Sequence, residues 1–403
     1  MSTPAHRPAN IYSPLYFLAS LGAGGLAVTF FMYLMFWVPH PNQPVPVFED
    51  ILKAFQTGPA WLQTAIVVAW VGIAVMVFLN VKMLLWNLKQ VGIYKTTDAW
   101  KALSNSNGET QIMAMPLALA MTVNAGFIVG LVYVPGLWVV VEYLFPLALI
   151  AFLAIGYLAF RQLGTFIGRL AERGGFNCEA NNSFAQMMPA FALAMVGVGL
   201  SAPAALSTVK VVAGISLVAS TFFLVASVVI TVIALILGLR SMMENGANAE
   251  TAPTLMVVIP IMTVLGILIV RQSHGLHVHF GSHGSAGDML ITLSRMISLQ
   301  VLIALFGLLV LKRVGYAKRF LTGSENSAGA YGLVCPGVAL NVMSMFWINK
   351  GLVGAGIIAK FGTAYFVLSI IPIALQIAMV ALVFHLNRRH FKGTASGNAV
   401  PAE

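Results

Sequence analysis

Ten long apolar stretches follow one another along the chain, and short polar or Gly/Pro-rich segments separate them. Each stretch has 20 residues or more, which is enough for an α-helix to cross a hydrocarbon layer about 30 Å thick. The expected spans lie near residues 13–38, 59–86, 110–133, 135–160, 183–202, 209–239, 252–271, 287–311, 328–349 and 361–386. The pattern predicts an all-α polytopic membrane protein of ten helices, with both termini on the same side.

Four of these spans carry a proline inside the apolar run, in the segments MAMPLALA, QMMPAFAL, VVIPIMTV and LVCPGVAL. Pro116, Pro189, Pro260 and Pro336 are 73, 71 and 76 residues apart, and all of them fall on odd-numbered spans. Each of these spans follows a polar cluster: SNSNGET, CEANNS, ENGANAET or SENSAG. Self-similarity at a fixed period indicates a repeated fold, here a helical hairpin.

The first hairpin is expected to be a fifth copy. Its odd span reads YFLASLGAGGLAV, with Ser20 where the proline would fall and a glycine run that is equally permissive. The hairpins would then cover residues 13–86, 110–160, 183–239, 252–311 and 328–386 of a single transmembrane domain, with short tails at both ends.

A proline inside a helix leaves a carbonyl without its hydrogen bond, which is costly in lipid but not beside a hydrated cavity. The repeat therefore favours a quasi-fivefold ring of hairpins, in which proline-kinked odd helices line a central pore. The alternative is that membrane helices simply tolerate proline better than soluble helices do.

Composition supports the membrane class and sets the topology. Hydrophobic residues make up 59% of the chain and charged residues only 8%, against about 25% in a soluble domain. The first apolar run is too long for a signal peptide.

Of the 22 Lys and Arg residues, 16 fall on the terminal side of the predicted spans, and six fall on the opposite side or inside spans: Lys53, Lys210, Arg271, Arg295, Lys350 and Lys360. The positive-inside rule then places both termini in the cytoplasm, in a plasma membrane (a bacterial inner membrane). The net charge of +10 is thus a topology signal, and no nucleic-acid partner is expected.

The predicted central pore is uncharged, with a weakly polar wall and no Asp or Glu in the middle of any odd span. A wall without acids, with bases near its mouths and helix N-termini facing one end, favours small anions over cations. Asn124 and Asn341 could equally bridge neighbouring helices. The candidate pore-lining residues are Ser20, Met115, Pro116, Asn124, Met188, Pro189, Ile259, Pro260, Cys335, Pro336 and Asn341.

The arrangement resembles the tellurite-resistance/dicarboxylate transporter family, which includes the plant slow anion channels. The resemblance runs from YFLASLGAGGLA in the first span through LVCPGVALNV in the ninth. It implies five hairpins in a ring, inner helices kinked by mid-membrane prolines, and a homotrimer with one pore per subunit. The family usually has a phenylalanine gate before the ninth-span proline, where this chain has Cys335. The gate candidates are Cys335 and, as a soft apolar constriction, Met115 and Met188.

Several polar residues fall outside this pattern. The segment RQSHGLHVHFGSHGSAG is expected to be an external loop, whose His274, His277, His279 and His283 could bind a metal, sense pH or simply be polar; no metal site is predicted. Glu142 and Arg295 lie within even spans, where they could pair or make hairpin or subunit contacts. Cys178 and Cys335 are not expected to form a disulfide.

No catalytic motif appears, so neither an enzyme nor a cofactor is expected. The sequence favours an anion channel or secondary transporter, carrying a small inorganic anion, sulfite or another oxyanion, or a C4-dicarboxylate. The main alternative is an NrfD/PsrC-type membrane quinol-interacting subunit of an oxidoreductase complex. The glycine-rich first span would suit that class, but the repeated prolines are not explained by it. A purely structural membrane protein is a third possibility.

Overall fold

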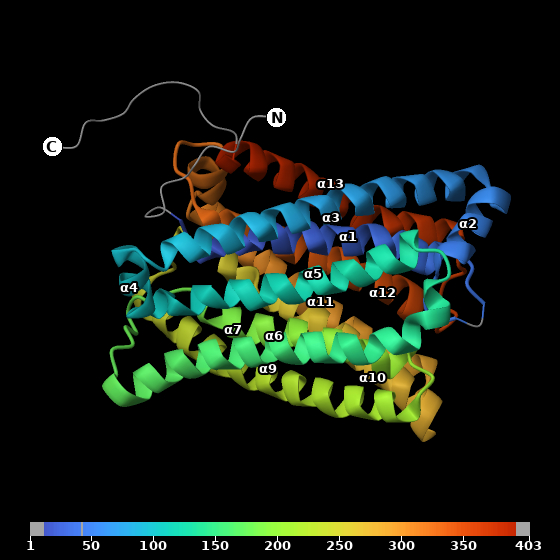
Figure 1. The fold of residues 1–403 in the computed structure, drawn as a ribbon. Coiled ribbons are helices and arrows are strands. Elements are labelled where there is room, and N and C mark those ends of the chain that lie inside the picture. The colour runs from blue at the N-terminus through green and yellow to red at the C-terminus, as the bar shows by residue number, and fades with distance from the viewer. Residues whose placement is uncertain (1–11, 42, 392–403) are drawn as a thin grey trace.

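A computed structural model describes residues 12–41 and 43–391, and within them the chain is helical and forms no strand (Figure 1). Ten helical segments are long and apolar enough to cross a membrane, as predicted. They are Pro14–Trp37, Ala60–Tyr94, Asn107–Tyr133, Leu137–Arg173, Ala185–Leu206, Lys210–Asn245, Ala252–Phe280, Ala286–Arg313, Ala328–Val353 and Thr363–Phe391.

The odd-numbered spans are composite, whereas each even-numbered span is one α-helix. The odd spans consist of η2 (Pro14–Tyr16) and α1 (Phe17–Trp37); η3 (Asn107–Met113) and α5 (Ala114–Tyr133); η4 (Ala185–Met187), α7 (Met188–Leu200) and α8 (Ala202–Leu206); η5 (Ala252–Met256) and α10 (Val258–Phe280); and η7 (Ala328–Leu333), α12 (Val334–Phe346) and η8 (Trp347–Val353). The even spans are α3 (Ala60–Tyr94), α6 (Leu137–Arg173), α9 (Lys210–Asn245), α11 (Ala286–Arg313) and α13 (Thr363–Phe391). The connections hold α2 (Phe48–Thr57), α4 (Asp98–Ser104) and η6 (Ala317–Leu321).

The long helices run side by side, with α4 at one end of the bundle and α2 at the other (Figure 1). Tyr16 and Phe391, near the two ends of the described chain, pack together with ring centroids 5.8 Å apart. We call this the terminal end of the bundle, and the end that carries α2 the opposite end.

Burial alternates along the chain. In the odd spans 50% to 83% of the most apolar window is buried inside the protein, against 22% to 33% in the even spans. The even spans instead expose large apolar side chains, such as Val139 and Tyr143 on α6 and Leu302 on α11, as a lipid-facing surface does. The odd spans are therefore inner helices and the even spans outer helices.

The inner spans contact one another in a closed cycle: α1 with α5, α5 with α7, α7 with α10, α10 with α12, and α12 with α1. Each inner span also contacts the outer helix that follows it in sequence. Between the first and last hairpins, Gln376 of α13 donates to Thr29 Oγ1 of α1 at 2.8 Å and accepts a hydrogen bond from Tyr33.

Every inner span starts with a 3₁₀ turn that continues into an α-helix. Pro116, Pro260 and Pro336 are the third residue of their α-helix, and Pro189 is the second. These are positions in the first turn, where the missing N–H matters least. The sequence instead predicted prolines deep inside helices; in the described residues, prolines interior to an α-helix occur on the outer helices, at positions 146 and 372. The first span shares the 3₁₀ start, which agrees with its interpretation as a fifth copy.

The polar clusters before the inner spans connect neighbouring repeats at the terminal end. Hydrogen bonds within or beside these clusters join the starts of neighbouring inner spans. The bonds run from Ser13 Oγ to Gln111 Oε1 (3.3 Å), from Gln186 Nε2 to Asn107 O (2.9 Å), from Phe184 N to Thr254 Oγ1 (3.0 Å) and from Ser327 Oγ to Glu250 Oε1 (2.9 Å).

The outer helices extend beyond the ends predicted for them at the terminal end, for example to Arg173 rather than residue 160 in α6. The apolar stretch ends before the helix does, because a helix can continue with polar residues on its surface. The amphipathic α2, which buries Ile51 and Ala54, was not predicted because it lies in a segment of mixed polarity. The predicted tails fall largely outside the described residues.

One ion pair at the terminal end is mostly buried. Arg169 Nε of α6 lies 3.0 Å from Glu109 Oε2 of η3, and the two side chains are 15% and 8% exposed. Arg169 also donates to the carbonyl of Ser106 at 3.1 Å. The pair fixes the start of the third span against the outer helix of the same hairpin.

We expect Arg169→Met to destabilise the protein by about 3 kcal/mol, because it leaves the Glu109 carboxylate buried without a cation. The E109Q/R169M double variant should recover part of this loss. Thermal unfolding in detergent measures the stability of the single and the double variant. The matched control is Arg319→Met, which breaks a pair whose side chains are 46% and 48% exposed and should destabilise the protein much less than R169M does. Equal losses in R169M and R319M would contradict the prediction.

Candidate functional site

A cavity of about 730 Å³ lies between the inner spans. All the inner spans contribute to its lining, as do the outer helices α6 and α11. One lining residue from each inner span is Gly25 of α1, Asn124 of α5, Met195 of α7, Thr263 of α10 and Val338 of α12. The cavity extends from residues at the opposite end, such as His40 and Lys350, to the level of Pro260 and Cys335.

The glycine run of the first span allows α1 to pack closely beside this cavity. A Cβ atom at Gly25 would lie 2.9 Å from a methyl group of Val338 on α12, and one at Gly24 would lie 2.7 Å from Met121 on α5. Both distances are shorter than an ordinary contact between carbon atoms. The run therefore has a packing role, holding α1 tightly between α12 and α5.

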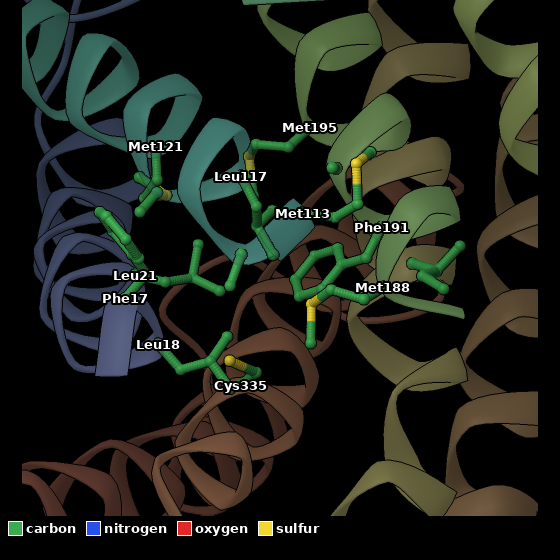
Figure 2. Close-up of a cluster of buried hydrophobic side chains, with 14 of the residues drawn as sticks. Phe17, Leu18, Leu21, Met113, Leu117, Met121, Met188, Phe191, Met195 and Cys335 are labelled. Carbon is green, nitrogen blue, oxygen red and sulfur yellow. The ribbon is translucent and has the colours of Figure 1, made fainter. Parts of the chain in front are cut away.

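An apolar plug of buried side chains lies between the inner helices and borders the cavity (Figure 2). Figure 2 shows side chains from α1, α5, α7 and α12 and the end of η3 directed toward one another. All of these side chains are buried. The plug consists of Phe17, Leu18, Leu21, Met113, Leu117, Met121, Met188, Phe191, Met195 and Cys335. Leu21, Met121, Phe191, Met195 and Cys335 also line the cavity, so the plug forms its floor.

Three of the residues predicted to line a pore are in the lining of this cavity: Asn124, Pro260 and Cys335. Of the predicted gate residues, Met188 and Cys335 lie in the plug, and Met115 lies outside both the plug and the lining. The other predicted residues are outside the lining: Ser20, Met115, Pro116, Met188, Pro189, Ile259, Pro336 and Asn341.

Several of the residues outside the lining bind outer helices instead. Ser20 Oγ donates to the carbonyl of Asn80 on α3 at 2.8 Å. The carbonyl of Ile259 accepts from Gln300 of α11 at 3.2 Å, and Asn341 Nδ2 donates to the carbonyl of Pro372 at 2.6 Å. These bonds hold hairpins together, so Asn341 acts as the interhelical bridge that the sequence left open. Asn124 Nδ2 donates to the carbonyl of Ala120 within α5 at 3.1 Å and to Met195 Sδ of α7 at 3.7 Å, so Asn124 connects two inner helices while it lines the cavity.

Charged residues line the cavity toward the opposite end, where the sequence predicted an uncharged wall. They are Arg271, Lys350 and Asp288, accompanied by His274 and His277. Asp288 accepts hydrogen bonds from Ser285 N and Oγ at 3.0 and 2.8 Å and caps α11. Just beyond the ninth span, burial and then the charge of Lys350 lower the pKa of Lys360. In the cavity lining, Arg271 and Lys350 thus outnumber the one acidic residue, Asp288.

Arg271 was not singled out from the sequence because the seventh span was predicted to end there. In the structure α10 continues to Phe280, so Arg271 lies about 13 Å from the helix end at 1.5 Å per residue. It follows Pro260, Val264 and Ile267 at helical spacing, and all four line the cavity. This helical spacing was the sequence signal that could have identified Arg271 as a cavity residue.

The histidine-rich segment is largely helical rather than a loop. His274, His277 and His279 lie on α10, and His283 lies in the connection to α11. His279 Nε2 is 2.9 Å from the carbonyl of Ser207, and the rings of His277 and His283 are 5.8 Å apart. Across residues 12–41 and 43–391, no three His, Cys, Asp or Glu side chains are grouped to hold a metal ion.

Glu142 and Arg295, the two charged residues predicted within even spans, do not contact each other. Glu142 accepts hydrogen bonds from Ser207 Oγ at 2.7 Å and from Thr208 N and Oγ1 at 2.6 and 2.8 Å, which fastens α6 to the connection between α8 and α9. Arg295 is exposed on α11. Cys178 is exposed, Cys335 is buried, and both are free thiols.

No protein-family model matches the chain, and no curated protein matches it. Function therefore has to be argued from the cavity, its plug and its charges.

The cavity predicts a difference in access between neighbouring positions of α12. Val342 lines it, whereas the adjacent Met343 is fully buried outside the lining. In protein carrying Cys178→Ser and Cys335→Ala, a small charged methanethiosulfonate added at the opposite end should modify V342C several-fold faster than M343C. Mass spectrometry of timed reactions measures this. Similar rates at the two positions would mean that the cavity does not admit a charged solute.

Proposed function

We propose that the protein is an anion channel or secondary transporter, and that this cavity is part of the route of a small anion. The observation that carries the proposal is a single cavity lined by all the inner spans and closed on one side by an apolar plug. In the proposed arrangement, the closed cycle of inner-helix contacts corresponds to a quasi-fivefold ring around a central pore. The outer helices separate this pore from lipid.

The charge of the cavity favours anions over cations. Arg271 and Lys350 are basic, and the acidic Asp288 is held by the Ser285 N–H and hydroxyl. Cation pathways commonly use rings of acidic side chains or exposed carbonyl oxygens. A basic mouth above an apolar wall would concentrate anions and repel cations. The cargo would be an inorganic anion, sulfite or another oxyanion, or a C4-dicarboxylate.

The plug would act as the gate. An apolar constriction blocks ions because water leaves it, and small movements that widen it restore conduction. Phe191 is the aromatic residue of the plug that also faces the cavity, and Met188 lies in the same plug. We propose that Phe191 of α7 closes the pathway, since Cys335 occupies the position where the family it resembles has its phenylalanine.

The resemblance to the tellurite-resistance/dicarboxylate transporter family supports the same proposal. By that resemblance the protein would assemble as a homotrimer with one pore per subunit. The Lys and Arg distribution would place it in a plasma membrane with both termini in the cytoplasm.

The alternative is an NrfD/PsrC-type quinol-interacting membrane subunit. The ionisable groups at the opposite end of the cavity, including His274 and Asp288, favour this alternative, because a quinol site needs proton acceptors. It would also require a docked iron–sulfur partner.

Purified protein in liposomes should pass at least one of chloride, nitrate, sulfite and malate without any partner protein. Ion-selective electrodes or isotope uptake measure the flux, with protein-free liposomes as the control. Absence of flux for all four anions, together with co-purification of an iron–sulfur subunit, would support the quinol alternative instead.

Phe191→Ala should raise this flux by about 10-fold, which corresponds to lowering the barrier by about 1.4 kcal/mol. The truncation shortens the plug where it meets the cavity. Met188→Ala should have a smaller effect in the same direction. Met115→Ala is the matched control, since Met115 lies outside the plug and the cavity lining. Phe191→Leu provides a milder change if the alanine variant folds poorly. An unchanged flux in the folded F191A or F191L protein would show that Phe191 is not the gate.

A further inference from the structure

Arg271 carries a positive charge into the interior of the cavity. Protein surrounds its side chain, which is nevertheless only half-buried. The exposed part of the side chain faces the cavity. It lies on the face of α10 that continues from Pro260, 11 residues earlier, which is about 16 Å along the helix. A charged residue at such a depth normally has a partner or a function.

The guanidinium of Arg271 has no acidic partner. Within the described ranges, no Asp or Glu oxygen lies within 4.0 Å of it. Among the described residues, its hydrogen bond runs from Nη1 to the carbonyl oxygen of Val198 at 2.7 Å. A guanidinium has five N–H donors in a fixed planar arrangement, so this bond leaves most of them for a ligand. An enclosed cation without a counter-ion is unfavourable, and an anion in the cavity would offset that cost.

The bond to Val198 holds the guanidinium in place. Val198 lies near the end of α7, and its carbonyl oxygen also accepts from Ser201 Oγ at 2.8 Å. Arg271 is therefore anchored between α10 and α7, both of which line the cavity. An oriented guanidinium recognises a ligand with less loss of side-chain entropy than a freely moving one.

The other basic groups lie nearer the mouth. His274 is 14 residues after Pro260, and Lys350 is 14 residues after Pro336, so the repeat places them at a similar depth. Arg271 is three residues deeper than His274, about 4.5 Å along α10. An anion that enters past Lys350 would meet Arg271 before it reaches the apolar floor.

We infer that Arg271 is a binding site for a small planar oxyanion, which the cavity prefers to a halide. This inference builds on the proposed anion pathway and names the class of anion that the pathway selects. Two parallel N–H groups of a guanidinium match the two oxygens of a carboxylate or a similar planar oxyanion. A spherical halide cannot use that match. The apolar residues Ile267 and Val342, which share the cavity, provide no competing polar ligand.

The first test is binding to the purified full-length protein, which does not depend on transport. Sodium formate should raise the thermal unfolding temperature more than sodium chloride does at the same concentration. Arg271→Lys keeps the charge but loses the planar pair of donors. It should weaken formate binding about 10- to 100-fold, as expected for loss of a charge-assisted pair, and leave the response to chloride almost unchanged. Arg271→Gln should abolish the preference for formate. Lys350→Gln is the matched control at the mouth and should retain it.

The second test is selectivity in liposomes. Wild-type flux of formate should saturate at low concentration and should compete with chloride flux, whereas R271K should lose both properties. Formate stabilisation that depends on Arg271, without any anion flux, would support this site and overturn the proposed transport function. Flux with the same anion preference in wild type, R271K and R271Q would overturn the site and leave the transport function standing. Equal stabilisation of the wild type by formate and chloride would also overturn the site.

Discussion

The inner spans cannot face lipid, and the arrangement of all the other helices depends on this constraint. Each inner span changes from a 3₁₀ turn to an α-helix, and α7 and α12 are only 13 residues long. Irregular backbone at membrane depth is tolerated only where protein or a hydrated cavity surrounds it. The outer helices, with 28 to 37 residues of unbroken α-helix, provide that surrounding. The alternation of buried and exposed spans along the chain follows from it.

The ten spans and their inner–outer alternation could be predicted because length, hydropathy and the prolines act locally. The position of each proline relative to its helix could not. Whether Pro116 interrupts a helix or starts one depends on where the preceding segment becomes helical, and here that segment is a 3₁₀ turn. The 3₁₀ turns are held by hydrogen bonds between different repeats, such as that from Ser327 to Glu250, and sequence distance gives no indication of such pairs.

The sequence also did not indicate which face of each inner helix lines the cavity. A helix that is apolar all round gives no periodic signal to distinguish its sides. Ser20 and Asn341 are examples, because both are buried in hairpin contacts although they lie on inner spans. The opposite case is α10, where Pro260, Val264, Ile267 and Arg271 share one face. There a single charged residue marks the face that lines the cavity, because its cost in lipid leaves no other position for it.

The floor of the cavity and the carbonyl group that anchors its cation belong to one helix, α7. Phe191 in the plug and Val198, which accepts from Arg271, both belong to α7 and both line the cavity. They are seven residues apart, about two helical turns, so they lie on the same side of α7. A displacement of α7 would therefore change the contact at Arg271 and the closure at Phe191 together. An anion that binds the guanidinium would also change the charge close to the Val198 carbonyl, and α7 connects that carbonyl to the plug.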